Sequence, residues 1–203
     1  SRYRRDKERS RDKYKNESGQ SKRLVISEAE VCTYAAVRMP ATYAAVHKVL
    51  ENTLMYCDEE ILSVLDIGAG VGTASFAVLN MISSVLEYTL VEREPNMIAF
   101  GKKLAQNSGI DVMFQWFNTD MEAFVASQKY DLVIASYSLN ELSQEKREKM
   151  LERLWETTSK LLIIIEPGTK EGFREIQEER KWLEESGGNI VAPCPSHKVC
   201  PIE

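Results

Sequence analysis

The sequence predicts an α/β fold, a doubly wound and mostly parallel sheet with helices on both faces. Two observations predict it. From residue 61 onward, short apolar segments alternate with longer amphipathic segments, as in chains of strand–helix–strand units. The first apolar segment, residues 61–67, ends in a glycine-rich loop that leads directly into a helix-compatible segment. With 203 residues and 43% hydrophobic content, the chain is long enough for one such domain and a flanking piece.

A helical segment, residues 24–57, is expected before this domain. Ser27 and Glu30 have the spacing of a capping box, which predicts a helix that begins at this point. Pro40 should end or kink that helix, because proline lacks an N–H and clashes with the preceding turn. A second helix is predicted over residues 42–56, where apolar residues recur every three or four positions.

The α/β domain itself, residues 58–203, is predicted to alternate strands with helices. Strands are expected near residues 61–67, 87–92, 111–117, 130–136 and 161–166, and a sixth near 189–192. Helices are expected near residues 72–83, 95–107, 120–127, 143–157 and 170–186. Pro95 suits the first turn of its helix, where a missing N–H has no partner to lose. Gly187 and Gly188 provide a stop for the last long helix.

Composition argues against several other classes of protein. The longest aliphatic run, residues 161–165, is far too short to cross a bilayer, so no membrane association is expected. The N-terminus is charged rather than apolar and shows no signal peptide. Because the chain starts with Ser1 and stops before a final antiparallel strand pair, we expect a fragment whose sheet is incomplete at the C-terminal end. Four cysteines make no disulfide framework, and Cys32 and Cys57 are expected to be buried small apolar residues.

The net charge of −5 conceals an asymmetry along the chain. Residues 1–23 carry ten Lys or Arg against four Asp or Glu, a net of +6, which leaves −11 for the remainder. A basic arm on an acidic body suits contact with RNA phosphates, because bound Lys and Arg release condensed counterions. The alternative is a solvated, partly helical or disordered leader. Both interpretations stay open.

The glycine loop carries the strongest functional signal. Dinucleotide-binding loops usually have the spacing G-x-G-x-x-G, but here the third glycine comes one residue early and Asp66 precedes the first by two. This D-x-G-x-G-x-G pattern resembles the first motif of S-adenosylmethionine (SAM)-dependent methyltransferases. Another nucleotide and a purely structural turn are the alternatives. Bare backbone N–H groups and room for the ligand are expected here, and the cofactor-binding candidates are Asp66, Gly68, Ala69, Gly70 and Gly72.

Two acidic residues at later strand ends are further candidates for the cofactor site. Ligands of open α/β sheets bind at the carboxyl ends of the strands, where the strand order reverses. Glu92, about twenty residues beyond the glycine loop, is placed to accept hydrogen bonds from both ribose hydroxyls. Asp120 follows the third strand and is placed to accept from the adenine amino group. Its alternative role is to cap the next helix, and the two roles are compatible.

The loop after the fourth strand would lie between cofactor and methyl acceptor. Ser136, where the loop begins, is a further cofactor-binding candidate. Tyr137, Asn140 and Glu141 are the candidate catalytic residues, placed to orient an acceptor or take its proton. The alternative is that Asn140 or Ser143 simply caps the following helix. Methyl transfer from a sulfonium needs alignment and desolvation rather than a metal or a covalent nucleophile. No Asn-Pro-Pro-Tyr loop is present, so the acceptor chemistry stays unassigned.

Several longer segments resemble one family. These segments are residues 34–45, 66–72, 139–142, 166–169 and 192–201. Together they resemble the ribosomal RNA methyltransferases related to mitochondrial small-ribosomal-subunit protein 22, over residue 24 to the end. The resemblance implies a Rossmann-like SAM methyltransferase fold, and the small ribosomal subunit or its RNA as partner. Methylation of small-subunit ribosomal RNA is the expected activity. Because some members work as assembly factors, a non-catalytic SAM-binding assembly factor is the alternative.

The resemblance also implies a metal site. In mitochondrial members, the cysteines that match Cys194 and Cys200 help to hold an iron–sulfur cluster, with two further cysteines downstream. The chain stops three residues after Cys200, so we expect two free thiols here and a cluster only in a longer chain. His197 as a zinc ligand is a weaker alternative, since three ligands would be lacking. Bacterial cytoplasm and mitochondrial matrix are both open as compartments, and the cytoplasm is preferred.

Overall fold

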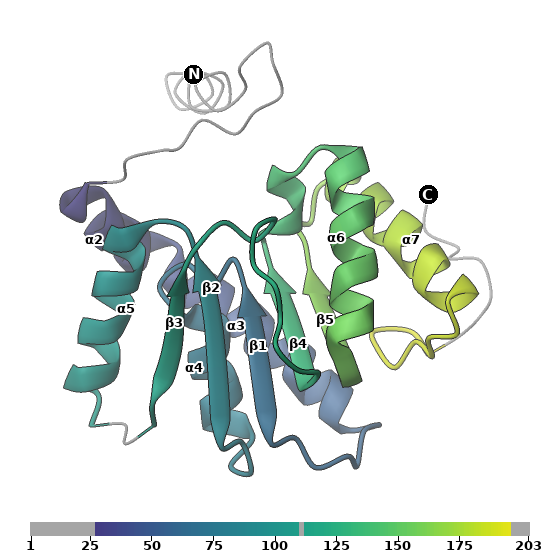
Figure 1. Ribbon diagram of the computed structural model, residues 1–203, viewed down its shortest axis with the longest axis horizontal. Helices are drawn as coiled ribbons and strands as arrows, with labels where there is room; N and C mark the ends of the chain where they lie inside the picture. The colour runs from purple at the N-terminus through teal and green to yellow at the C-terminus, as the bar shows by residue number, and fades with distance from the viewer. Residues whose placement is uncertain (1–26, 110–111, 196–203) are drawn as a thin grey trace.

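The sheet has five strands, all parallel, in the order β3-β2-β1-β4-β5. The computed structural model describes residues 27–109 and 112–195 (Figure 1). The strands are β1 (Ser63–Ile67), β2 (Glu87–Glu92), β3 (Phe114–Asn118), β4 (Tyr130–Ser136) and β5 (Thr158–Ile165). The helices are α2 (Glu28–Val37), α3 (Met39–Leu54), α4 (Thr73–Met81), α5 (Pro95–Asn107), the 3-10 helix η1 (Leu139–Glu141), α6 (Gln144–Thr157) and α7 (Lys170–Glu185). The predicted doubly wound α/β fold is confirmed.

Alternate residues of the strands build two separate cores. Val64, Leu90 and Ile134 face one side of the sheet, where they pack with residues of α3 and α4. Their chain neighbours Leu65 and Val133 face the other side and pack with α6. Helices thus cover both faces (Figure 1), which is why most positions of the central strands β1 and β4 are buried.

The strand order places a switch point beside β1. From β1 the chain passes outward through β2 to β3, and then returns to the other side of β1 for β4 and β5. Strand order therefore reverses between β1 and β4, where open α/β sheets bind their ligands at the carboxyl ends. In Figure 1 the strands end at the top of the sheet, and α2 lies at the upper left of that edge.

The helical segment before the sheet begins as predicted. The Ser27 hydroxyl accepts from the Glu30 N–H at 3.3 Å, and the Glu30 carboxylate accepts from the Ser27 N–H at 2.8 Å, so the capping box is confirmed. The chain breaks before Pro40, because α2 ends at Val37. The next helix starts at Met39 rather than at the predicted residue 42, since proline is tolerated in a first turn.

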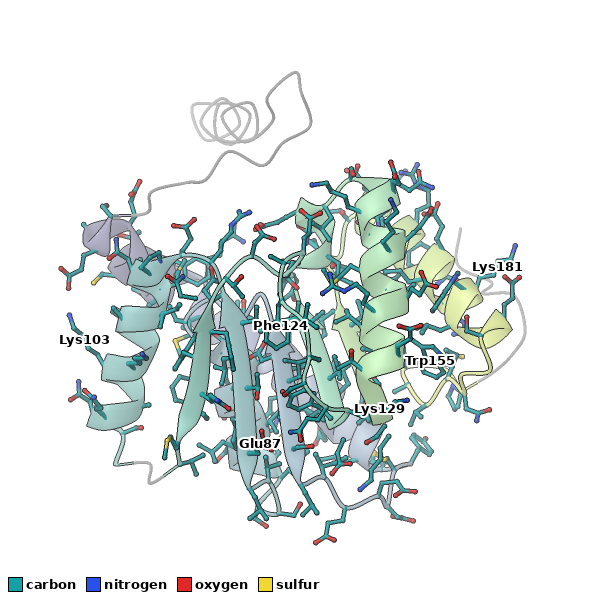
Figure 2. The ribbon with its side chains drawn as sticks, viewed as in Figure 1. Glu87, Lys103, Phe124, Lys129, Trp155 and Lys181 are labelled. Carbon is teal, nitrogen blue, oxygen red and sulfur yellow. The ribbon has the colours of Figure 1, made fainter. Side chains whose placement is uncertain are left out.

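Two predicted elements are wrong. Residues 120–127 form one turn, at 121–123, and are otherwise irregular instead of helical. Arg153 of α6 donates to the carbonyls of Glu122 and Phe124. A helix would use these carbonyls as acceptors for its own backbone N–H groups. Phe124 instead lies against the sheet, with its ring 5.4 Å from that of Phe117 (Figure 2). The predicted strand near 189–192 is also missing, because among the described residues this segment has no strand beside it to pair with.

A buried charged cluster joins α6 to α7. Arg147 lies within 2.6 Å of Glu175, 3.7 Å of Glu179 and 4.0 Å of Glu178. Arg147 thus faces three carboxylates, and Glu179 is only 5% exposed. Burial, together with the charge of nearby Glu166, raises the pKa of Glu179 to about 7.

Replacing Glu179 by Gln should therefore change how stability depends on pH. The folded-state pKa lies above the ordinary value, so Glu179 stabilises the fold while it is protonated, and this contribution is lost as the pH rises from about 4.5 to about 7. Glu179→Gln should raise the free energy of unfolding by about 1–3 kcal/mol at pH 8 and change it little at pH 5. Urea unfolding at both pH values measures the difference. Glu178→Gln, half-exposed on the same helix, is the control with a smaller expected effect. An equal effect of Glu179→Gln at the two pH values would contradict the assignment.

Candidate cofactor site

The loop between β1 and α4 has the backbone that only its glycines allow. Gly68, Gly70 and Gly72 have φ angles of 69°, 58° and 85°, all in the left-handed region. A Cβ on Gly68 would lie 2.5 Å from the Ser138 Cβ, so this glycine lets the β1 and β4 loops pass in close contact. A Cβ on Gly70 would meet nothing closer than the Tyr34 hydroxyl at 3.9 Å. The open part of the loop is therefore at Gly70.

The loop amides are not bare, contrary to the prediction. Gly68 and Ala69 both donate to the Val91 carbonyl, at 2.9 and 3.0 Å, and Gly72 donates to the Ala69 carbonyl at 2.8 Å. The Gly70 N–H donates to the Glu92 carboxylate at 2.8 Å. Because these four donors already have acceptors, the loop offers space and close backbone approach more than a row of free N–H groups.

Asp66 lies buried beneath the loop. It is 1% exposed and accepts from the Ser75 hydroxyl at 2.7 Å and the Ser75 N–H at 3.2 Å. Burial raises its pKa to about 6, while the hydrogen bonds from Ser75 act in the opposite direction. In the structure Asp66 ties the end of β1 to the first turn of α4, and its predicted contact with the cofactor stays a prediction.

Glu92 stands at the centre of the site. One of its carboxylate oxygens accepts from the Gly70 N–H and the other from the Glu94 N–H, each at 2.8 Å. Burial raises the pKa of Glu92, and these backbone hydrogen bonds oppose the shift. Each carboxylate oxygen has a second lone pair, so acceptance from ribose hydroxyls stays a prediction.

Arg93 links two of the predicted site residues. Its guanidinium lies 3.7 Å from the Asp120 carboxylate and 3.2 Å from that of Glu141. Asp120 also accepts from the Glu122 N–H at 2.9 Å, which is the capping alternative in the form of a turn. Burial raises the pKa of Glu141, and Arg93 opposes this. Sequence analysis missed Arg93, although its position directly after Glu92 at a strand end was a usable signal.

The loop after β4 contains the candidates for contact with a methyl acceptor. The Ser136 hydroxyl is buried and has no hydrogen-bond partner within the described residues. Tyr137 has a φ of 57°, rare for a residue other than glycine, and its N–H donates to the Ile165 carbonyl at 2.7 Å. Asn140 donates to the Glu166 carboxylate from both its backbone N–H, at 3.2 Å, and its side-chain amide, at 2.5 Å. Ser143, not Asn140, is the N-cap of α6, and its side chain makes no cap hydrogen bond.

A residue from α2 also reaches the glycine loop. Tyr34 packs against Val71 of that loop and Met97 of α5, and its hydroxyl approaches Gly70 as described above. Burial, and next the charge of Glu92, raises the pKa of Tyr34. Sequence analysis did not place Tyr34 in the site, because the docking of α2 on the loop is a tertiary contact.

The cysteines give no metal site in the part of the chain that is described. Cys32, Cys57 and Cys194 are free thiols, and no three His, Cys, Asp or Glu side chains there gather as metal ligands. Cys200 and His197 lie outside the described residues. Cys32 is exposed rather than buried as predicted, because α2 turns the face carrying Val31 inward.

Most of this chain aligns with mitochondrial proteins from human and from Schizosaccharomyces pombe. It is 26% identical over 196 residues to the human ribosome assembly protein METTL17, mitochondrial, a match that covers 88% of this chain and 42% of that protein. It is 29% identical over 203 residues to the Rsm22-cox11 tandem protein 2, mitochondrial, of Schizosaccharomyces pombe, covering 88% of this chain and 26% of that protein. The chain thus spans less than half the length of these relatives.

Solved structures share the fold at low sequence identity. The plantazolicin methyltransferase BpumL in complex with SAH superimposes with a TM-score of 0.61 at 14% identity, over 79% of this chain and 71% of that chain. A SAM-dependent methyltransferase from Clostridium acetobutylicum superimposes with a TM-score of 0.51 at 12% identity, over 63% and 51%. The methyltransferase-like fold that the glycine loop predicted is confirmed.

The family itself is established by a match over nearly the whole described chain. The family model described as mitochondrial small ribosomal subunit Rsm22 matches residues 28–203. These residues include both N-terminal helices, the glycine loop and the whole sheet. The chain therefore belongs to the Rsm22 family, and it carries a class I SAM methyltransferase-like fold.

Proposed function

We propose that the chain binds SAM at the carboxyl edge of its sheet and acts in assembly of the small ribosomal subunit. One observation carries the cofactor part: the Glu92 carboxylate lies 2.8 Å from the Gly70 N–H, so the acid of β2 meets the glycine loop of β1 at the switch point. In an α/β fold of this kind, the ribose of a bound cofactor and its amino-acid part would lie at this point of the sheet edge. Membership of the Rsm22 family supports the ribosomal part.

The charge of this edge favours SAM over a phosphate-bearing nucleotide. Glu92, Glu94, Asp120 and Glu141 surround it, with Arg93 as the cation that contacts three of them. A pyrophosphate would bring more negative charge to a site that already has an excess of carboxylates. SAM instead carries two positive groups, a sulfonium and an ammonium, and one negative group, its carboxylate. The electrostatics therefore support the SAM interpretation of the loop over the other-nucleotide alternative.

The residues present fit such a ligand. The nearest atom to a would-be Gly70 Cβ is the Tyr34 hydroxyl oxygen, at 3.9 Å, so space is available above the loop. The buried Ser136 hydroxyl lacks a hydrogen-bond partner among the residues described. Glu92 would accept from the ribose hydroxyls and Asp120 from the adenine amino group. The backbone from Gly68 to Gly72 would lie along the amino-acid part. When bound, SAM would supply a methyl group on a good leaving group.

Methyl transfer to small-subunit ribosomal RNA is the second candidate, favoured by the backbone of Tyr137. A left-handed φ at a non-glycine residue costs about 1–3 kcal/mol, and such strain is concentrated at functional sites. Against it, Asn140 is bound to Glu166 and Glu141 to Arg93, so these two catalytic candidates would have to exchange partners to meet an acceptor. The basic arm, residues 1–23, which would contact RNA, lies outside the described residues.

The relatives' names bear on the compartment. Both named relatives are mitochondrial, which favours the mitochondrial matrix over the bacterial cytoplasm that sequence analysis preferred. No helix among the described residues is both long and apolar enough to cross a membrane.

Two measurements on the 203-residue chain test the proposal. Calorimetry with SAM and SAH should show saturable binding of both. Incubation with methyl-labelled SAM and small-subunit RNA then separates the two candidates: label in the RNA supports methyl transfer, and binding without transfer supports the assembly factor. Absence of binding to either compound would contradict both. Deleting residues 1–23 should weaken RNA affinity without changing SAM affinity if the arm contacts RNA.

A further inference from the structure

Helix α2 lies outside the sheet but is built into the edge of the cofactor site. Val31 is fully buried and packs with Val71 of the glycine loop and Met97 of α5. Lys103 of α5 adds an ion pair to Glu28 at 2.9 Å. The helix is thus fixed on two elements that border the site, and its side chains have defined positions there.

Tyr34 is the α2 residue that stands over the open part of the loop. Its hydroxyl lies 3.9 Å from where a Gly70 Cβ would be, and it makes no hydrogen bond within the described chain. The charges of Glu92 and Glu141 act on its pKa in one direction and that of Arg38 in the other. The phenol therefore stands over the open part of the loop with a free donor.

Arg38 follows Tyr34 by one helical turn, so both lie on one side of α2. Its backbone N–H closes the helix by donating to the Tyr34 carbonyl at 2.7 Å. The side chain is exposed, and no carboxylate of the described residues lies within ion-pair distance of it. Arg93, by contrast, contacts three carboxylates. Within residues 27–109 and 112–195, Arg38 is thus a cation without an ion pair, one helical turn from Tyr34.

A zwitterionic ligand would use that cation. The ribose and the two positive groups of SAM suit the carboxylates of the site, but its α-carboxylate would be repelled by them. A guanidinium with its fork of donors can hold a carboxylate through two parallel hydrogen bonds. Resting on the function proposed above, we infer that Arg38, aided by the Tyr34 hydroxyl, binds the α-carboxylate of SAM and makes the site selective for ligands with an amino-acid chain.

Two ligands that differ in this group test the inference. SAH and 5′-methylthioadenosine share the adenosine and the sulfur, but only SAH carries the amino acid. Calorimetry on the 203-residue chain should show that Arg38→Ala weakens SAH binding about 10- to 100-fold and leaves methylthioadenosine unchanged. Arg38→Lys should retain part of the SAH affinity, and Tyr34→Phe should lose about 3- to 10-fold for SAH alone.

Arg174→Ala is the matched control, since Arg174 is 70% exposed on α7 and, in the described part of the chain, pairs with Glu178 of its own helix. It should change neither affinity. Thermal melting of each variant checks that the fold is kept. If the wild type binds SAH and Arg38→Ala binds it equally well, the inference is overturned but the proposed function is not. The same holds if Arg38→Ala loses affinity equally for SAH and methylthioadenosine. A wild-type chain that binds neither ligand would instead overturn the proposed function, and the inference with it.

Discussion

A Gly70→Val variant is expected to lose SAM and SAH binding by about 100-fold or more, equivalent to about 2.7 kcal/mol. Gly70 is the point where the loop is open, with the Tyr34 hydroxyl at 3.9 Å as the nearest atom to a would-be Cβ. A valine side chain would fill the space that the amino-acid part of the ligand needs. Its β-branched side chain also strains a backbone with a φ of 58°.

Calorimetry with SAH measures this loss, and circular dichroism should show the helices retained. Gly109→Val is the matched control, because Gly109 has a φ of 67° and nothing within 4 Å of a would-be Cβ. It carries a similar backbone cost beyond the end of α5, away from the site, and should bind SAH as the wild type does. Wild-type affinity in Gly70→Val would remove the basis for placing the ligand over this loop.

Gly68→Ala should lower the free energy of unfolding by about 3 kcal/mol. The added Cβ would lie 2.5 Å from the Ser138 Cβ, inside any real contact distance. Ser138 cannot easily move, because it is 4% exposed and its hydroxyl donates to the Ile67 carbonyl at 3.0 Å. The left-handed φ adds about 1–2 kcal/mol for any residue with a Cβ.

Urea unfolding of Gly68→Ala and Gly109→Ala separates these two contributions. Both alanines would adopt a similar left-handed φ, but only the one at position 68 meets a neighbour. Gly109→Ala should therefore cost about 1 kcal/mol. If the two variants are destabilised equally, the close contact between the β1 and β4 loops contributes nothing, and the role assigned to Gly68 is wrong.

Strand positions were predictable because their signal is local. Alternating apolar residues fix which strand positions face each core. The same alternation also indicates which core a polar residue of a strand faces. Asp66 has the parity of Val64, which faces the α4 side, so its burial under the loop could have been predicted. Its place two residues before Gly68 suggested a ligand contact instead.

Other features depend on partners far along the chain. Residues 120–127 have helical spacing, but Arg153, from a later helix, binds the carbonyls of Glu122 and Phe124. Asn140 is bound by Glu166, and Tyr34 enters the site through the packing of α2. No local pattern encodes these contacts, so the sequence located the edge of the sheet that forms the site but not the pairing of side chains within it.

The double hydrogen bond of Glu92 has a consequence for how a ligand is received. One carboxylate fixes the amides of Gly70 and Glu94, and so couples the turns that follow β1 and β2. The conformational entropy of these turns is lost during folding rather than at the moment of association. The proposed binding edge is in this sense preorganised, so an adenosyl ligand would meet turns that are already ordered.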